Sequence, residues 1–114
     1  MESNYSVLMS VYYKEHPEYL RQSMQSIYDQ TVPTDDFVLV CDGPLTPALD
    51  SVITNMQQTF CFRLHVIRLL KNGGLGNALN VGMQQCKNNL VARMDSDDIS
   101  RSDRCERQLA VFRD

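Results

Sequence analysis

The sequence predicts an α/β fold: a Rossmann-like, mostly parallel sheet with helices on both faces. Apolar runs of strand length alternate with segments whose apolar residues recur every three or four positions. This alternation repeats four times without interruption, an order typical of parallel sheets joined by right-handed crossovers. Polar residues follow each apolar run, at the carboxyl ends of strands where such sheets bind ligands.

The first half of the chain contains two of these strand–helix pairs. Residues 5–11 are the first expected strand, and Pro17 suits the first turn of a helix that extends to about residue 30. Residues 37–41 form the second expected strand and end at the turn Asp42-Gly43-Pro44. The apolar face of the second helix is marked by Leu49, Val52, Ile53 and Met56.

The second half continues the same order. Residues 62–69 alternate well enough for a third strand, and a glycine-rich turn over residues 71–76 opens the next helix. That helix has Leu75, Leu79 and Met83 on one side. Residues 89–94 read as a fourth, buried strand. The last helix is marked by Cys105, Leu109 and Phe112 and reaches Asp114 without a cap, so we expect the first half of a longer domain.

Composition narrows the class of protein. The 114 residues suit one domain, and the formal net charge of −3 gives no reason to expect nucleic acid as a partner. We expect no signal peptide and no membrane span, because no apolar run is long enough. The cysteines form no CxxC pair and suggest reduced thiols in the cytoplasm; they are Cys41, Cys61, Cys86 and Cys105.

Three carboxylates stand in four residues at Asp95-Ser96-Asp97-Asp98, directly behind the fourth expected strand. Like charges held this close repel one another unless a cation relieves them, and a hard divalent ion such as Mg²⁺ or Mn²⁺ prefers oxygen ligands. The alternative is a loop and a helix N-terminus, with Asp98 or Ser100 as the cap. The tetrad alone leaves both interpretations open.

The other strand ends favour the metal interpretation. Residues 12–15, 42–43, 71–74 and 95–98 follow the four expected strands, and all four segments are polar. Because the carboxyl ends of parallel strands meet at one edge of a sheet, these segments are expected to converge on one rim.

Read together, these segments resemble the donor-binding half of family 2 glycosyltransferases with the GT-A fold. The resemblance runs over nearly the whole chain and depends on an ordered set of motifs. These are Ser6 to Tyr12, Leu20 to Ile27, Val38 to Gly43, Asn72 to Gly82, and Ala92 to Ile99, which contains a DxD motif. It implies that residues 1–114 are the half of a GT-A domain that binds the nucleotide sugar.

The resemblance also implies roles for individual residues. Asp42 matches an acid that contacts the nucleotide base, although a turn-forming Asp before Gly-Pro is the alternative. Ser10 and Tyr12 match the first-strand exit that frames the nucleotide, where Tyr12 could stack on the base or pack on the sheet. Glu15 matches an acid that faces the ribose or supports another ligand.

The remaining implied contacts lie after the third and fourth strands. Lys71 could pair with phosphate, and Gly74 lies where a helix N-terminus favours anions. Asn80 matches a family asparagine that forms a structural or nucleotide-side hydrogen bond. Asp97 and Asp95 match the DxD acids that hold Mn²⁺ or Mg²⁺, with Asp98 as a further ligand or a cap. Arg93 could neutralise these acids when no metal is bound.

Members of this family are inverting transferases, so the resemblance implies transfer of a sugar from a nucleotide-diphosphate donor, expected to be UDP-linked. The implied acceptor is a saccharide or a lipid-linked glycan, as in surface polysaccharide assembly. The catalytic base of the family lies in the second half of the domain, so we expect it beyond Asp114. The expected location is the cytoplasm, or the inner face of the membrane for a longer protein.

The main alternative is an NAD(P)-binding Rossmann module. Gly74-Leu75-Gly76 opens a helix after a strand, and Asp95 ends the next strand about twenty residues later, as in the dinucleotide fingerprint. Leu79 stands in place of the third glycine, and Asp95 belongs to a group of acids. A Mg²⁺-binding receiver-like module is less consistent, because its paired acids follow the first strand.

Overall fold

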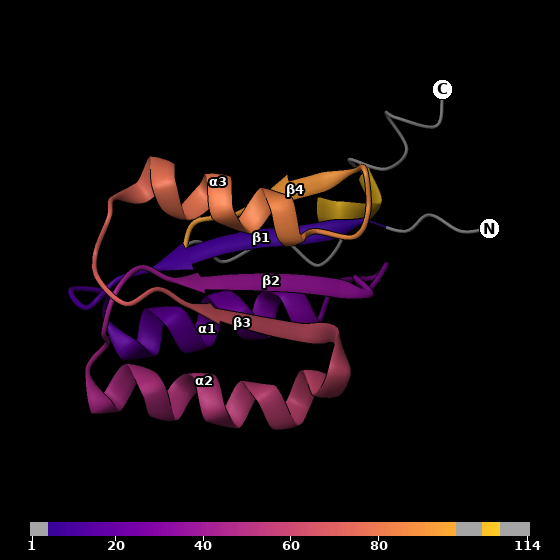
Figure 1. The fold of residues 1–114 in the computed structure, drawn as a ribbon. Helices are drawn as coiled ribbons and strands as arrows, with labels where there is room; N and C mark the ends of the chain where they lie inside the picture. Colours follow the sequence, from indigo (N-terminus) through magenta and orange to yellow (C-terminus); the bar gives the residue numbers. More distant parts are fainter. Residues whose placement is uncertain (1–4, 98–103, 108–114) are drawn as a thin grey trace.

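The computed structural model describes residues 5–97 and 104–107 and confirms the predicted α/β order (Figure 1). One sheet contains β1 (Ser6–Val11), β2 (Asp36–Cys41), β3 (Leu64–Arg68) and β4 (Val91–Arg93). The helices between them are α1 (Pro17–Tyr28), α2 (Pro47–Phe60) and α3 (Leu75–Gln85). All strand pairs are parallel, in the order β3-β2-β1-β4.

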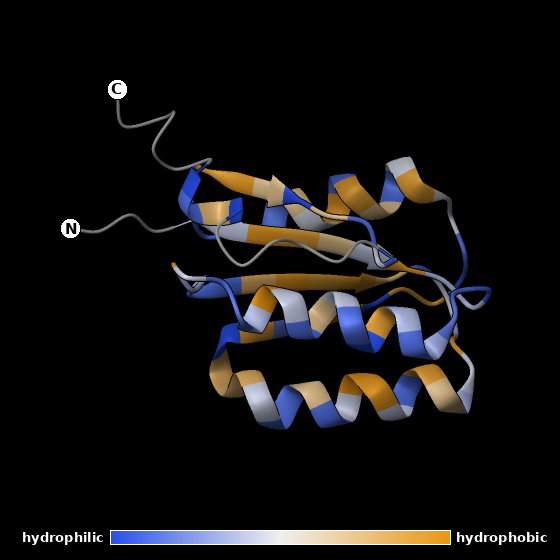
Figure 2. Cartoon of the chain, turned by 180° about the vertical axis from the view of Figure 1, so that it is seen from behind, coloured by the Kyte–Doolittle hydropathy of each residue, from blue (hydrophilic) through white to orange (hydrophobic). Residues whose placement is uncertain are grey.

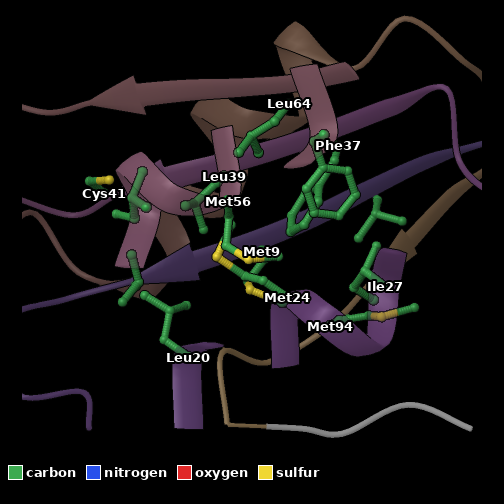
Figure 3. Packing of buried hydrophobic residues seen from close by; sticks show 14 of the residues in the cluster. Met9, Leu20, Met24, Ile27, Phe37, Leu39, Cys41, Met56, Leu64 and Met94 are labelled. Atoms are coloured by element: carbon green, nitrogen blue, oxygen red, sulfur yellow. The ribbon is translucent and has the colours of Figure 1, made fainter. Parts of the chain in front are cut away.

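The two faces of the sheet are covered by different helices, as predicted. Alternate residues of β1 and β2 point to opposite faces. Met9 and Leu39 pack with α1 and α2 in the larger apolar cluster, which Figure 3 shows from close by. Leu8 and Val38 pack instead against α3. Hydropathy follows this layering, with largely apolar strands beside helices in which polar and apolar residues alternate (Figure 2).

Both helices on the larger cluster begin with a proline, as predicted for α1. Pro17 is the first residue of α1, and the Nδ1 atom of His16 accepts a hydrogen bond from the Glu18 N–H at 3.2 Å. Pro47 begins α2 in the same way, after the cap residue Thr46. Proline suits this position because its missing N–H would have no partner inside the helix. The short segment from Val11 to Pro17 is therefore anchored at both ends.

Helix α3 buries a different side from the one that the leucine spacing suggested. Its buried residues are Ala78 and Gly82, whereas Leu75 and Met83 are exposed. A Cβ added to Gly82 would lie 2.3 Å from Leu8 Cδ1. The absence of a side chain at Gly82 therefore lets the helix approach the sheet closely, and the larger apolar residues are displaced from the contact. Leu79 packs only partly against this face.

Two expected strand boundaries were also wrong. Phe62 lies in a 3-10 turn (Cys61–Arg63) and is 84% exposed, so β3 begins only at Leu64. Cys61, where α2 ends, has a positive φ of 56°. The backbone changes direction there, so the strand begins later in the sequence than predicted. The fourth strand is shorter than expected and half-exposed, because β4 pairs only with β1 in the part of the sheet that is described.

The last predicted helix is visible in part. Residues 104–107 are helical and Cys105 is buried, whereas Leu109 and Phe112 lie outside the described residues. All four cysteines are unpaired, as expected. Within residues 5–97 and 104–107, no helix combines the length and apolar character needed to cross a membrane.

Candidate functional site

A cavity of about 400 Å³ lies at the carboxyl end of the sheet, within the size range of small-molecule sites. All four strand exits contribute to it, as the parallel order predicts. The lining residues are Ser10, Val11, Tyr12, Asp42, Asn72, Gly74, Leu75, Asp95 and Ser96. Residues up to 86 positions apart in the sequence, from Ser10 to Ser96, therefore line the same cavity.

Asp42 connects the end of β2 to the glycine-rich loop. It is only 5% exposed. Its Oδ1 atom accepts a hydrogen bond from the Gly73 N–H at 2.8 Å, and Oδ2 accepts one from the Gly74 N–H at 3.1 Å. The side chain thus reaches a loop about thirty residues away in the sequence, which a local turn-forming aspartate would not do. Its predicted contact with a nucleotide base remains a prediction.

Two glycines allow the loop to approach β2 closely. Gly43 has a φ of 91°, and a Cβ there would lie 2.6 Å from the backbone nitrogen of Asn72. Gly74 has a φ of 94° and is the cap residue before α3. Both backbones occupy the left-handed region that residues with side chains rarely adopt. The Oδ1 atom of Asn72 also accepts from the Gly74 N–H, at 3.2 Å.

The exit of β1 also lines the cavity. Ser10 is half-buried, and Tyr12 lines the cavity with 44% of its surface exposed. Because the Tyr12 ring is not buried against the sheet, it is available to stack on a ligand. Glu15 does not line the cavity; its Oε1 atom accepts a hydrogen bond from the Ser96 hydroxyl.

The acid loop follows β4 directly. The Met94 N–H donates to the Leu8 carbonyl at 3.0 Å, and the Ser23 hydroxyl donates to the Asp95 carbonyl at 3.2 Å. Asp95 and Asp97 are exposed, whereas Ser96 between them is only 8% exposed. Asp95 lines the cavity. Asp98 and the alternative cap Ser100 lie outside the described residues.

A second cavity of about 310 Å³ shares Ser10, Leu75 and Asp95 with the first. Arg93 and Arg104 also line it. Arg93 thus lies at the same cavity as Asp95, as its predicted neutralising role requires, but it makes no ion pair with another residue in the described ranges. That role remains a prediction.

Besides Glu15 and Asp97, two further predicted site residues lie outside the lining of this cavity. Lys71 is exposed on the loop after β3, and Asn80 is exposed on α3. The lining residues that the sequence did not predict are Val11, Asn72, Leu75 and Ser96. Asn72 belongs to the quoted family motif and could have been chosen on that ground. Ser96 carried no signal, because a serine between two acids looks like a spacer until its burial is known.

The position of the glycine-rich loop disagrees with the dinucleotide alternative. In that fingerprint the glycine-rich turn follows the first strand, which lies in the middle of the sheet. Here the loop that contains Gly74 follows β3, at the edge of the sheet. The acid at the end of the next strand belongs to β4, which pairs with β1 and not with β3.

Comparison with known proteins gives a consistent result. The family described as "Glycosyl transferase family 2" matches residues 6–114. The amylovoran biosynthesis glycosyltransferase AmsE of Erwinia amylovora is 45% identical over 95% of this chain and 40% of its own length. The UDP-Gal:alpha-D-GlcNAc-diphosphoundecaprenol beta-1,3-galactosyltransferase of Escherichia coli is 44% identical over 90% of this chain and 36% of its own.

Solved structures agree on the fold. S. aureus TarS in complex with UDP superposes with a TM-score of 0.81 and 26% sequence identity, over 96% of this chain and 32% of that one. The chain spans about 40% of the length of the two relatives named above. With the GT-A type of sheet present and the family matched over almost every residue, the chain belongs to glycosyl transferase family 2.

Proposed function

We propose that the chain binds a nucleoside-diphosphate sugar, UDP-linked, for hexosyl transfer with inversion to a polysaccharide or glycolipid acceptor. One observation supports this most strongly: Tyr12, Asp42 and Asp95 come from three strand exits and line one cavity of about 400 Å³. The names of two relatives add support, since one is a UDP-galactose-dependent transferase with a lipid-linked acceptor and one was solved with UDP.

The end of the cavity formed by Tyr12 and Asp42 suits the base. Each carboxylate oxygen of Asp42 has two lone pairs and gives one to a glycine N–H. The remaining lone pairs can accept the imide N–H of uracil, and the exposed ring of Tyr12 can stack on the base. Gly74 places the N-terminus of α3 at the same cavity, where free N–H groups favour the diphosphate.

The acid loop fits the divalent metal that the family implies. Asp95 and Asp97 offer hard oxygen donors, and their carboxylates make no hydrogen bond or ion pair with another described residue. The described residues gather no group of three metal-ligating side chains. Two carboxylates suit Mg²⁺ or Mn²⁺ that completes its shell with diphosphate oxygens and water. When bound, the ion would offset negative charge on the departing nucleoside diphosphate. Asp98 stays a predicted third ligand.

No residue of this chain is assigned as the base that accepts the acceptor's proton, so the proposal for these residues is donor binding. A lipid-linked acceptor would place the reaction at the inner face of the membrane, and otherwise in the cytoplasm. The four unpaired cysteines are consistent with that reducing compartment.

Calorimetry on the 114-residue chain tests donor binding. Circular dichroism first establishes that the chain is folded. UDP is then titrated with Mn²⁺, with EDTA in place of the metal, and finally NAD is titrated without metal. We expect heat of binding for UDP with Mn²⁺ and at least tenfold weaker binding with EDTA. A folded chain that gives no heat with UDP and Mn²⁺ contradicts the proposal, and NAD binding would restore the dinucleotide alternative.

A further inference from the structure

Ser96 differs from the two acids beside it. Its side chain is buried while Asp95 and Asp97 are exposed, and its hydroxyl donates to Oε1 of Glu15 on the loop after β1. The hydrogen bond joins segments 81 positions apart in the sequence. The central residue of the acid loop is therefore hydrogen-bonded to a carboxylate that lies outside the loop, that of Glu15.

Glu15 is itself fixed at both of its oxygens. Oε2 accepts a hydrogen bond from the His16 N–H at 3.0 Å, while Oε1 is used by Ser96. The Glu15 N–H donates to the Tyr12 carbonyl at 3.1 Å, which closes a turn. Because both oxygens are engaged and the residue does not line the cavity, its geometry fits support of the acid loop better than contact with a ribose.

Contacts from α1 and β1 also restrain the acid loop. The Ser23 hydroxyl of α1 donates to the Asp95 carbonyl at 3.2 Å, and Ser23 is fully buried. The acid loop is thus attached to β1 through Met94, to α1 through Ser23, and to the β1 exit through Glu15. Of these contacts, only the one from Glu15 holds a side chain that lies between the two acids.

We propose that Glu15 and Ser96 form a brace that positions Asp95 and Asp97 for a divalent cation. This inference rests on the proposed function, because it assumes that the two acids hold the metal. The buried hydroxyl fixes the turn so that the neighbouring carboxylates remain directed outward, and the Glu15 carboxylate adds negative charge behind them. Partners that orient metal ligands in this way typically contribute 10- to 100-fold in metal affinity.

Four variants separate hydrogen bonding from charge. Ser96→Ala and Glu15→Ala remove the brace from either side. Ser96→Thr keeps the hydroxyl, and Glu15→Gln keeps an oxygen that can accept from Ser96 but loses the charge. Two exposed residues on the surfaces of other segments serve as matched controls: Ser51→Ala for loss of a hydroxyl on α2, and Asp29→Asn for loss of a carboxylate at the end of α1.

Two measurements on the folded chain are needed. Electron paramagnetic resonance gives the affinity for Mn²⁺ alone, and amide hydrogen exchange of residues 95–97 is followed without metal. We expect Ser96→Ala and Glu15→Ala to weaken Mn²⁺ binding roughly 10- to 100-fold and to speed exchange in the loop. Ser96→Thr should stay within about threefold of wild type, and Glu15→Gln should fall between. Both controls should match wild type.

The outcomes distinguish the brace from the proposed function. Wild-type affinity in both alanine variants overturns the brace, and so does weakened affinity that is equal in the two controls. Faster exchange with unchanged Mn²⁺ affinity also overturns the positioning role, because the contact would then be structural only. If the wild type binds no Mn²⁺, the metal part of the proposed function fails. The exchange data then test only whether the Glu15–Ser96 hydrogen bond restrains the loop: faster exchange only in the brace variants supports this restraint, and unchanged exchange overturns it.

Discussion

The two ends of the sheet use aspartate in opposite ways. At the amino end, Asp36 begins β2 and is buried; its Oδ2 atom accepts from the Ser6 hydroxyl at 2.7 Å and from the Lys87 N–H at 2.8 Å. His65 lies 3.5 Å from Oδ1. At the carboxyl end, Asp95 and Asp97 are exposed, and no other described residue pairs with their carboxylates.

This difference shows that the hydrogen-bond partners of a carboxylate distinguish a structural acid from one that can bind a ligand. The oxygens of Asp36 are occupied by groups of the fold itself, so a ligand would have to displace them. Burying such a group is tolerated only because its hydrogen bonds are satisfied. Asp42 is intermediate, since it is buried and bonded to two glycine N–H groups yet still lines the cavity.

The largest contrast is expected between Asp36→Ala and Asp97→Ala. Removing the Asp36 carboxylate leaves the Ser6 hydroxyl and the Lys87 N–H without their buried acceptor, so we expect a loss of about 3 kcal/mol in the free energy of unfolding. Asp97→Ala should change that free energy by about 0.5 kcal/mol or less, while weakening Mn²⁺-dependent UDP binding more than tenfold. Urea unfolding and calorimetry measure the two effects.

Asp36→Asn provides the control at the amino end, because its amide oxygen can take the place of Oδ2 and still accept both hydrogen bonds. Its loss of stability should be smaller than that of Asp36→Ala. Equal stability losses for Asp36→Ala and Asp97→Ala would contradict the distinction between the two ends.

A smaller contrast is expected between two glycines of the site. Gly43→Ala places a Cβ 2.6 Å from the backbone of Asn72 at a φ of 91°, so we expect a loss of about 2 kcal/mol and weaker UDP binding through the displaced loop. At Gly76, in the first turn of α3, a Cβ would meet nothing within 4 Å. Gly76→Ala should therefore stabilise the chain by about 0.5 kcal/mol or more. Thermal unfolding measures whether each substitution raises or lowers the stability. A Gly43→Ala chain as stable as the wild type would show that the loop moves to accommodate the added Cβ.

The order of elements could be predicted because its signals are local. Pro17 sits at a helix start whatever surrounds it, and the strand runs are apolar because both faces of the sheet are covered. The face of α3 could not be predicted in the same way. Its contact depends on the missing side chain of Gly82 opposite Leu8, and hydrophobic spacing alone favoured the leucines.

The candidate site shows the same distinction between local signals and long-range contacts. The convergence of Tyr12, Asp42 and Asp95 follows from parallel strand order, which the sequence displays. The hydrogen bonds of Asp42 to Gly73 and Gly74, and of Ser96 to Glu15, join segments that only the folded chain brings together. Residue types and their order predicted which strand ends converge on the cavity, but long-range contacts determine which carboxylate oxygens remain open.

The smallest expected effect compares two tyrosines at the opposite ends. Tyr5 is buried beside the Cys105 thiol and donates to the Val32 carbonyl, and this burial raises the pKa of Tyr5 well above its ordinary value of 10.0. Tyr5→Phe should lose about 1 kcal/mol of stability at pH 7, the worth of one hydrogen bond. Tyr12→Phe alters an exposed hydroxyl at the cavity, and we expect its stability at pH 7 to match that of the wild type.

The difference in the free energy of unfolding between wild type and Tyr5→Phe should close as the pH rises. Below pH 10 the Tyr5 hydroxyl is protonated in both states, so its folded contact contributes fully. Above that pH the unfolded chain releases the proton while the folded chain retains it, which favours unfolding by about 1.4 kcal/mol at pH 11. Urea unfolding at pH 7, 10 and 11 in matched salt measures the change. A gap that stays constant over this range would mean that Tyr5 ionises as readily in the folded chain as in water, and the amino end would then be no more closed than the cavity.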